Sequence, residues 1–447
     1  MARMFGTDGV RGIANQDLTP ELAYKLGRAG AFVLTEGARK PRIVVAKDTR
    51  ISGDLLESAL VAGILSVGAQ ALCVGIVSTP SVAILTRHYE ADAGVMISAS
   101  HNPVEYNGIK FFNKEGYKLS DDLEDQIEAI VKGEDELPRP VGRHIGHRVF
   151  MDDAQDVYIA YLKSIFDIRL DGLKIAVDCA NGSNYKIAPR LLKDLGAEVF
   201  AINDKPDGTN INRDCGSTHI KALRDYVREV GADVGLAFDG DADRLIAVDE
   251  KGEVVDGDKV MVICALAMKE KGKLRNNAVV VTVMSNMGLD IALKSHEIDV
   301  VKTKVGDRYV LEEMLRGDYA IGGEQSGHVI FLDHNTTGDG LVTALNLLSV
   351  MVEKRQPLSS LASVMEVYPQ VIVNARVSES KKHVFAEDEE ISEKIKDLEE
   401  MLKGEGRVLI RPSGTEPLIR VMLEGKDLDV LKAEAKRLAL FIEQRLG

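Results

Sequence analysis

One arrangement of short apolar strands and helical stretches occurs three times along the chain, and it constrains the fold more than any other feature. Each copy consists of strand, helix, strand, helix and strand, and a polar loop follows the third strand. Short strands that alternate with helices predict βαβ units, because parallel strands need a crossover connection between them. We therefore expect an α/β fold with mainly parallel sheets and right-handed crossovers.

The tail of the chain differs from the three copies. From about residue 367 it contains three strands and a final amphipathic helix, which predicts a small α+β domain. We expect three similar βαβαβ domains with mixed, mainly parallel sheets plus this C-terminal domain, at residues 1–155, 156–255, 256–367 and 368–447. Strands are expected at 43–46, 71–77, 94–97, 175–177, 199–202, 234–238, 279–281, 300–301, 319–321, 370–377, 408–410 and 418–423, and helices at 55–68, 81–89, 188–195, 220–230, 289–295, 308–315 and 428–446.

The polar loop of each copy occupies an equivalent place, directly after the third strand. Open α/β sheets bind ligands beyond the carboxyl ends of their strands. The three loops are therefore expected to face one shared cleft. The alternative is that polar, glycine-containing loops simply end the strands and carry no function.

The composition limits the partners of the chain. With 56 Lys and Arg against 70 Asp and Glu, its 447 residues carry a formal net charge of −14, which argues against a nucleic-acid partner. The acidic segments 121–136 and 387–400 hold most of this charge and are expected to be solvated faces. Four dispersed cysteines, the absence of an apolar leader and the absence of a run of about 18 apolar residues favour a cytoplasmic protein without a membrane partner.

Three carboxylates, Asp239, Asp241 and Asp243, stand at alternate positions directly after strand 234–238. An extended chain would point all three to one side, where they repel one another unless a cation lies between them. Oxygen ligands without His or Cys favour Mg2+ or Mn2+ over zinc, and Arg244 adds a fork suited to phosphate. The simpler interpretation is an Asp-rich surface turn.

The loop after strand 94–97, SASHNP at 98–103, presents hydroxyl groups at the end of a buried strand. A serine that faces a carboxylate-bound cation suits phosphoryl transfer, in which positioning and charge neutralisation dominate. His101 would then donate to phosphoryl oxygens, and Lys110 would be a general acid or base or a charge clamp. The alternatives are a hydroxyl-capped turn and a solvated surface lysine.

Further loops carry groups that suit a phosphosugar. Glu324 and Ser326, in loop 322–328, combine a carboxylate with a hydroxyl, which suits a vicinal diol, and His328 is a candidate proton shuttle. The sequence RPSGTEP at 411–417 combines an Arg, hydroxyls and a Gly, which with Arg420 is typical of a phosphate site. The alternatives are a structural histidine and a Pro/Gly turn. The opening FGTDGVRG at 5–12 is either a turn or an arm that reaches a site.

The motifs SASHNP (98–103), DGDADR (239–244), GEQSGH (323–328) and RPSGTEP (411–417) occur in this order at domain-sized spacing. From end to end, the chain resembles the α-D-phosphohexomutase superfamily. Its opening at 5–12 and Gln325 most resemble the bacterial branch that acts on an amino-sugar phosphate. The resemblance implies four domains around one cleft.

The resemblance also implies roles for individual residues. Ser100 would carry a phosphoryl group that activity requires, and one Mg2+ per chain would be held by Ser100, Asp239, Asp241 and Asp243. The implied catalytic residues are Ser100, Lys110, His328, His101 and Arg244, and the implied substrate-binding residues are Glu324, Ser326, Arg411, Ser413, Gly414, Thr415, Arg420 and Arg11.

The implied reaction interconverts glucosamine 6-phosphate and glucosamine 1-phosphate through a 1,6-bisphosphate, and it would supply UDP-N-acetylglucosamine for cell-wall precursors. A homodimer is a candidate assembly. The first alternative is a mutase of the same superfamily that acts on glucose or mannose phosphates. The others are a phosphatase with Asp239 or Asp241 as nucleophile and a non-catalytic phosphosugar-binding protein.

Overall fold

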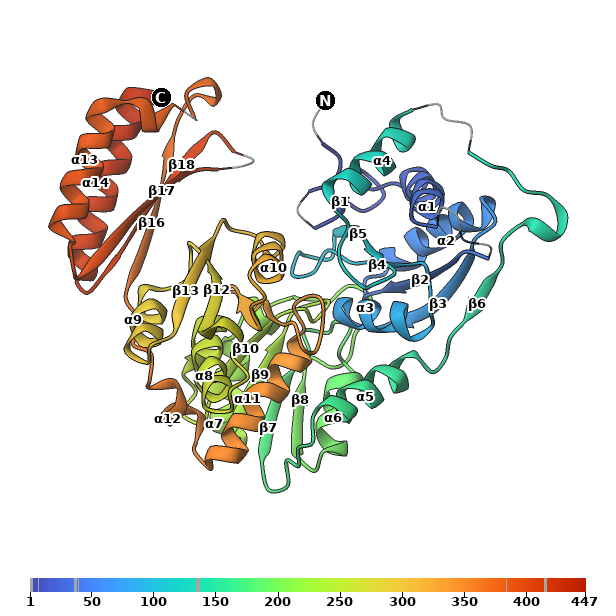
Figure 1. Ribbon diagram of the computed structural model, residues 1–447, viewed down its shortest axis with the longest axis horizontal. Helices are drawn as coiled ribbons and strands as arrows, with labels where there is room; N and C mark the ends of the chain where they lie inside the picture. The colour runs from blue at the N-terminus through green and yellow to red at the C-terminus, as the bar shows by residue number, and fades with distance from the viewer. Residues whose placement is uncertain are drawn as a thin grey trace. The chain divides into compact units, whose positions relative to one another are not determined.

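The structure is a computed structural model that describes residues 3–6, 8–35, 38, 40–133, 137–382, 384–413 and 416–447 (Figure 1). The chain divides into two compact units. The first consists of Met1–Met284 and Asp299–Ser363, and the second consists of Ser285–Ile298 and Val364–Gly447. The chain therefore passes between the units three times, and each unit is described below by itself.

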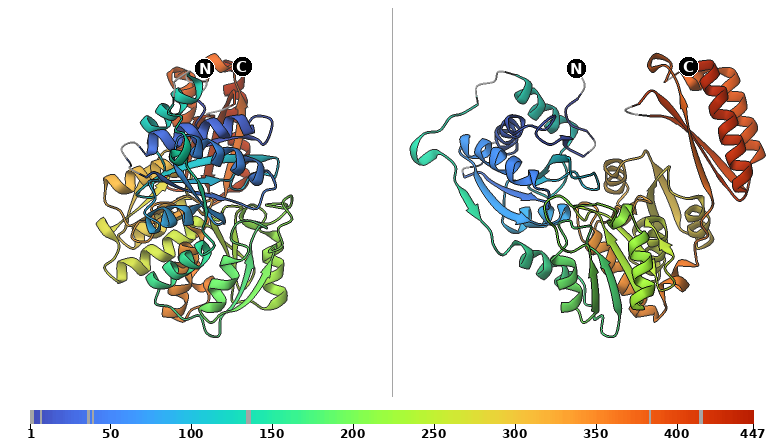
Figure 2. Two further views of the ribbon diagram at one scale, coloured as in Figure 1. Left: turned by 90° about the vertical axis from the view of Figure 1, so that its right-hand side faces the viewer. Right: turned by 180° about the vertical axis from the view of Figure 1, so that it is seen from behind.

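The N-terminal part of the first unit is a mixed sheet between helices. Its elements are β1 (Val10–Ile13), α1 (Pro20–Leu34), β2 (Arg42–Lys47), α2 (Ser52–Ser66), β3 (Gln70–Ile76), α3 (Thr79–His88), β4 (Ala93–Ile97), β5 (Tyr106–Asn113), α4 (Asp121–Lys132) and β6 (Arg148–Phe150). The strand order is β1-β5-β4-β2-β3-β6. Ile43 and Val45 point to the face that α1 and α2 cover, and α3 covers the opposite face (Figures 1 and 2).

Two further sheets complete the first unit, with strand orders β11-β10-β9-β7-β8 and β13-β12-β14-β15. The elements of the first are α5 (Ala154–Ile165), β7 (Lys174–Asp178), α6 (Ile187–Asp194), β8 (Glu198–Ile202), α7 (Lys221–Val230), β9 (Val234–Phe238), β10 (Leu245–Asp249) and β11 (Val254–Val255). Those of the second are α8 (Gly257–Glu270), β12 (Ala278–Thr282), β13 (Asp299–Thr303), α10 (Asp307–Arg316), β14 (Ile321–Gly323), β15 (Val329–Phe331), α11 (Gly340–Lys354) and α12 (Leu358–Ala362).

The three repeats share one feature that their sequences did not reveal. After the third strand of each repeat, the chain turns back into an antiparallel neighbour: β4 pairs with β5, β9 with β10, and β14 with β15. The other pairs of the central strands are parallel, as between β2 and β4 or β7 and β9. The expected mixed, mainly parallel sheets are confirmed, and each polar loop is the connection of an antiparallel hairpin.

The second unit is an antiparallel sheet with two helices on one face (Figure 1). Its elements are α9 (Met287–Ser295), β16 (Gln370–Arg376), α13 (Glu389–Met401), β17 (Gly406–Pro412), β18 (Leu418–Gly425) and α14 (Leu428–Leu446), and the strand order is β16-β18-β17. Helix α14 begins and ends where the sequence predicts. Helix α9 belongs to this unit because the Met287 N–H donates to Glu424 Oε1 at 3.1 Å and the Asn286 amide donates to the Tyr368 carbonyl at 2.9 Å.

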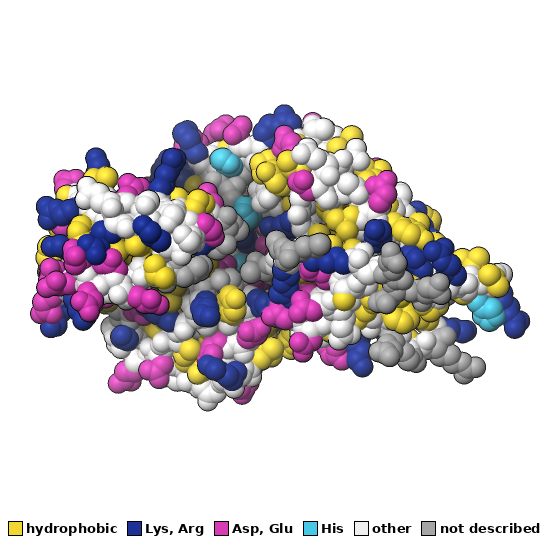
Figure 3. Space-filling model, turned by 90° about the horizontal axis from the view of Figure 1, so that it is seen from above, with side chains coloured by type: hydrophobic (Ala, Val, Ile, Leu, Met, Phe, Trp, Pro, Cys, Tyr) yellow, Lys and Arg dark blue, Asp and Glu magenta, His cyan; other side chains and the backbone are white. Residues whose placement is uncertain are grey.

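The acidic segment 121–136 differs from the expected solvated face. Acidic and basic side chains are interspersed on the face shown in Figure 3. The segment 121–136 is not simply a solvated face, because Glu124 and Glu128 are buried, at 7% and 8% exposure. Glu124 lies 3.2 Å from Arg3, so α4 supplies buried acids to an ion-pair network. Across the described residues, every helix is too short or too polar to span a membrane.

Candidate active site

Ser100 lies at the start of the connection between β4 and β5 and is 1% exposed. Its φ of +51° lies in the left-handed region, where a non-glycine residue persists only if its surroundings hold it. Its N–H donates to Ser98 Oγ at 3.0 Å, and its Oγ donates to Asp239 Oδ2 at 2.6 Å. The hydroxyl of Ser100 is therefore fixed against the acidic loop of the following repeat.

Asp48 and Arg50, which the sequence analysis missed, hold the Ser100 loop. Their buried side chains form an ion pair with a nitrogen–oxygen distance of 3.0 Å. The Arg50 guanidinium donates to the carbonyl oxygens of Ser100 at 3.0 Å, Asn102 at 2.8 Å and Pro103 at 2.6 Å. Asp48 accepts from Ser98 Oγ at 2.6 Å. The signal in the sequence was a charged Asp-Thr-Arg directly after the first strand of the repeat.

The carboxylates of Asp239, Asp241 and Asp243 converge, with candidate ligand oxygens within 4.8 Å of one another. They meet through a turn rather than along an extended chain, because Ala242 has a φ of +59°. Burial and the charges of Asp243 and Asp241 raise the pKa of Asp239 well above its ordinary value. Close carboxylates of this kind repel one another, so the cluster disfavours full ionisation without a counter-charge.

The donor set of this cluster fits a hard divalent cation. All three side chains are buried, and the ligands are oxygen atoms alone, which suits Mg2+. Among the described residues, Oδ1 of Asp241 and Oδ1 of Asp243 are buried without a hydrogen-bond partner. The Thr79 hydroxyl holds the other oxygen of Asp241 at 2.6 Å. The Oδ1 atoms of Asp241 and Asp243 are thus available to a cation, and Thr79 of α3 holds the acidic loop in place.

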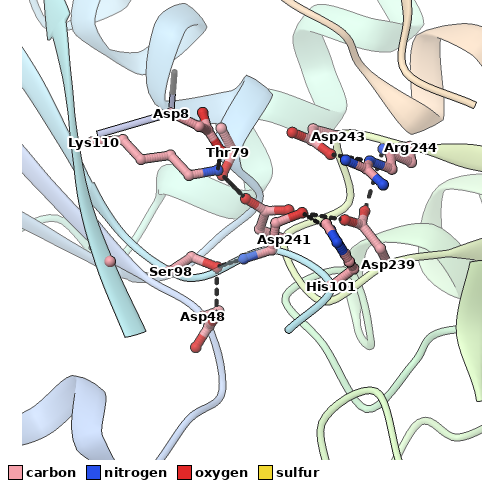
Figure 4. A network of polar contacts seen from close by, with 12 residues as sticks. Asp8, Asp48, Thr79, Ser98, His101, Lys110, Asp239, Asp241, Asp243 and Arg244 are labelled. Carbon is pink, nitrogen blue, oxygen red and sulfur yellow. Dashed lines mark hydrogen bonds and ion pairs between the residues drawn. The ribbon is translucent and has the colours of Figure 1, made fainter. Parts of the chain in front are cut away.

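Lys110 and Arg244 bring positive charge to the cluster (Figure 4). Lys110 Nζ lies 2.8 Å from Asp241 Oδ2 and 2.8 Å from Asp8 Oδ2, and the side chain is 2% exposed. Burial alone would lower the pKa of Lys110, but Asp241 and Asp8 raise it, so Lys110 is charged at neutral pH. Arg244 Nε lies 3.8 Å from Asp243 Oδ1. The alternative that Lys110 is a solvated surface residue is therefore wrong.

The two histidines near the cluster have opposite character. Burial and the charges of Arg244 and Arg11 lower the pKa of His101 to about 4, and its Nδ1 lies 3.3 Å from Ser100 Oγ. Burial would also lower the pKa of His328, but Asp243 and Asp307 raise it. His328 Nε2 lies 3.2 Å from the Gly338 nitrogen and 3.5 Å from Asp307 Oδ2, so it can accept when neutral and donate when protonated.

The loop of Glu324 lies beside the acidic loop. Glu324 Oε1 accepts from the Gly306 N–H at 3.1 Å, and Ser326 is exposed. Gly327 has a φ of +93°, and a Cβ there would lie 2.2 Å from the carbonyl oxygen of Leu245. The Leu245 N–H donates to the Gly327 carbonyl at 3.0 Å. Only glycine permits this close approach, which joins the hairpin loops of the second and third repeats.

In the second unit, Arg411 and Arg420 lie directly opposite each other on β17 and β18. Burial and the charge of Arg420 lower the pKa of Arg411. Ser413 is 5% exposed, whereas Gly414 and Thr415 lie outside the described residues. Two facing guanidinium groups that repel each other are suited to binding an anion. In the first unit, Arg11 forms an ion pair with Asp8.

The fold and this group of residues define a class of protein. Four family models match the chain. Three are described as phosphoglucomutase/phosphomannomutase, alpha/beta/alpha domains I, II and III, and they match residues 2–138, 156–252 and 256–368. The fourth, the C-terminal domain of the same family, matches residues 372–441. The chain belongs to the phosphoglucomutase/phosphomannomutase family, and the predicted membership of the phosphohexomutase superfamily is confirmed.

Relatives with assigned names narrow the class. The chain is 62% identical over 447 residues to a phosphoglucosamine mutase of Thermoanaerobacter sp., covering 100% of both chains. It is 61% identical over 446 residues to a phosphoglucosamine mutase of Clostridium novyi, covering 100% of this chain and 99% of the relative. A crystal structure of a phosphoglucomutase/phosphomannomutase family protein from Burkholderia thailandensis has the same fold, with a TM-score of 0.81, 24% identity and coverage of 99% and 98%. The predicted resemblance to the amino-sugar branch is confirmed.

Proposed function

We propose that this chain interconverts glucosamine 6-phosphate and glucosamine 1-phosphate, and so supplies UDP-N-acetylglucosamine synthesis. The observation that carries the proposal is the identity of 61–62% to phosphoglucosamine mutases across the whole chain. The second candidate, a mutase of glucose or mannose phosphates, shares the family and the same acidic cluster. No described residue of the site favours it over the first.

The proposed cofactor is one Mg2+ per chain, held by Asp239, Asp241 and Asp243 together with a phosphorylated Ser100. The convergent carboxylates and their unpartnered oxygens support this assignment. The cation would neutralise charge on the transferring phosphoryl group. A phosphatase with Asp239 as nucleophile is disfavoured, because the Asp239 carboxylate accepts from the Ser100 hydroxyl rather than facing open space.

In the proposed reaction, phosphorylated Ser100 gives its phosphoryl group to O1 of the sugar 6-phosphate, and the bond between Ser100 Oγ and phosphorus breaks. The resulting 1,6-bisphosphate reorients, and its 6-phosphoryl group returns to Ser100 Oγ. In this step His328 would take the proton of the attacking O1 hydroxyl, and His101, whose Nδ1 lies 3.3 Å from Ser100 Oγ, would relay a proton to that oxygen as its bond to phosphorus breaks. The return transfer reverses both proton movements, while Lys110 and Arg244 supply positive charge. His328 suits proton transfer, because it has partners in both protonation states.

The remaining assignments extend this proposal. Glu324 and Ser326 would bind sugar hydroxyls, and Arg411, Ser413, Gly414, Thr415, Arg420 and Arg11 would bind the phosphate that is not transferred. The proposed sequence domains are 1–155, 156–255, 256–367 and 368–447, although α9 of the third packs within the compact C-terminal unit. A cytoplasmic location agrees with four buried, free cysteines, and a homodimer remains the proposed assembly.

The decisive experiment compares wild type with Ser100→Ala on the 6-phosphates of glucosamine, glucose and mannose. We expect wild type to prefer glucosamine 6-phosphate and the variant to lose turnover while it keeps its circular dichroism spectrum. Intact mass and phosphosite mapping should locate one phosphoryl group on Ser100 of wild type. Phosphate on an aspartate, or full activity of the variant, would contradict the mechanism.

A further inference from the structure

The four motifs do not contain all the charged residues around the acidic cluster. Asp8 lies in the N-terminal segment before β1, Lys118 lies between β5 and α4, and Asp307 begins α10. Their side chains are mostly buried, with exposures of 17%, 14% and 16%. Buried charges of this kind are costly unless they are paired, so their partners indicate what they do.

The partners form a closed ring of acids and bases. Starting at the cluster, Asp241 pairs with Lys110 at 2.8 Å, and Lys110 pairs with Asp8 at 2.8 Å. Lys118 Nζ then lies 2.6 Å from Asp8 Oδ1 and 2.5 Å from Asp307 Oδ2. From Asp307 the ring continues through His328 Nε2 at 3.5 Å, and His328 Nδ1 lies 3.4 Å from Asp243.

Lys118 is the link between the two halves of this ring. One half contains Asp8 and Lys110 and ends on Asp241, and the other contains Asp307 and His328 and ends on Asp243. Burial alone would lower the pKa of Lys118, but Asp307 and Asp8 raise it, so the link is charged. The ring thereby joins segments from the first and third repeats to the acidic loop of the second.

We propose that Lys118 is a positioning residue that, by holding Asp8 and Asp307 together, fixes Lys110 against Asp241 and His328 against Asp243. The proposal rests on the proposed function, in which Lys110 and His328 act on the transferring phosphoryl group. Lys118 forms ion pairs with Asp8 and Asp307, and its charge also acts on Asp243 through space. Its effect on geometry therefore passes through Lys110 and His328.

The test is Lys118→Met, with Lys114→Met as the matched control, because Lys114 lies on the same connection and is 72% exposed. A displacement of catalytic groups of about 1 Å can cost up to about 100-fold in rate. We expect K118M to lower kcat at least about tenfold with KM changed less than about threefold, and K114M to match wild type. Mg2+ should still raise the Tm of K118M, since the three carboxylates remain.

The double variant Asp307→Asn with Lys118→Met distinguishes a positioning role of Lys118 from a purely structural one. It removes an acid and a base together, so it leaves fewer buried charges without a partner. If K118M does not fold, the double variant carries the test. We expect it to fold and to keep a kcat at or below about a tenth of wild type. A folded K118M or double variant with kcat within about twofold of wild type would overturn the proposal, and so would loss of the Mg2+ effect on Tm.

The outcome is distinguishable from failure of the proposed function. If wild type turns over glucose or mannose phosphates instead, the same comparison is made with that sugar. If wild type turns over none of the three, the proposed function has failed. In that case the rate at which a hexose 1,6-bisphosphate phosphorylates Ser100, measured by intact mass, is compared between wild type and Lys118→Met. We expect slower phosphorylation of the variant, and equal rates would contradict the proposal.

Discussion

Ser100 Oγ and Asp239 Oδ2 lie 2.6 Å apart, although 139 positions separate the two residues in the chain. Ser100 follows β4 and Asp239 follows β9, the third strands of two successive repeats. Their contact shows that equivalent hairpin loops meet. The fold itself therefore holds the hydroxyl of the proposed phosphoryl carrier against the carboxylate cluster.

The carboxylate cluster predicts a pH-dependent response to metal removal. Because the pKa of Asp239 is raised in the folded protein, the metal-free protein loses stability as the pH rises above the ordinary range of an aspartate. In EDTA, Tm should fall between about pH 5 and about pH 8, and Mg2+ should raise Tm more at the higher pH. Thermal melts of wild type and Asp239→Asn test this. A metal-free Tm that is equally pH-dependent in both proteins would argue against it.

Arg50 is predicted to set the position of Ser100. Arg50→Met removes three hydrogen bonds to the Ser100 loop and leaves Asp48 buried without its ion-pair partner. We expect a loss of about 3–5 kcal/mol in the free energy of unfolding and a fall in kcat of about 100-fold. Urea unfolding and steady-state kinetics measure the two effects. The exposed Arg143→Met serves as the control, and a Michaelis constant that changes instead of kcat would assign Arg50 to substrate binding.

The facing Arg411 and Arg420 are predicted to lower the thermal stability of the protein and to bind the phosphate of the substrate. Like charges directly opposite each other on neighbouring strands destabilise a sheet, whereas favourable cross-strand pairs stabilise it by roughly 0.2–1 kcal/mol. Arg420→Met should therefore raise Tm slightly in the absence of phosphate, while it raises KM for the sugar phosphate at least about tenfold. Inorganic phosphate should increase Tm of wild type but not of the variant. Arg437→Met, at an exposed position, is the comparison, and an identical phosphate response in all three proteins would refute the assignment.

Glu124 is predicted to make stability pH-dependent. Burial raises its pKa to about 7 despite the nearby charges of Arg3 and Arg308. A carboxyl with a raised folded-state pKa favours folding at low pH, and this contribution is lost as the pH rises towards 7. Glu124→Gln stays neutral, so its stability relative to wild type should improve by up to about 3 kcal/mol between about pH 5 and about pH 8. Urea unfolding at both values measures the difference, and parallel pH profiles would exclude the effect.

Residues that act through a local motif were predictable from the sequence. The strand before Ser100 and the strand before Asp239 were expected within a residue or two of β4 and β9, because continuous apolar runs identify buried parallel strands. The convergence of the three aspartates was also expected. The cause of this convergence was not expected, because the spacing of the aspartates does not indicate the left-handed backbone at Ala242.

Partners distant in the chain were not predictable. Asp8, Lys118 and Asp307 lie in three separate segments, and only the fold brings them together. The return strands β5, β10 and β15 were missed because each continues directly from a polar loop that was assigned to function. Glu124 was assigned to solvent because an acidic, amphipathic helix normally exposes its charges, whereas Arg3 and Arg308 cover this one.

Helix α9 has a practical consequence for anyone who wishes to isolate the C-terminal unit. A fragment cut at Val364 would lack Ser285, whose carbonyl accepts from Arg407, and Met287, whose N–H donates to the 0% exposed Glu424. In such a fragment Glu424 would keep its ion pair with Arg407 but would lose the Met287 N–H that covers its other oxygen. A fragment that keeps these contacts needs residues 285–298 supplied as well, either by circular permutation or as a separate peptide added in trans.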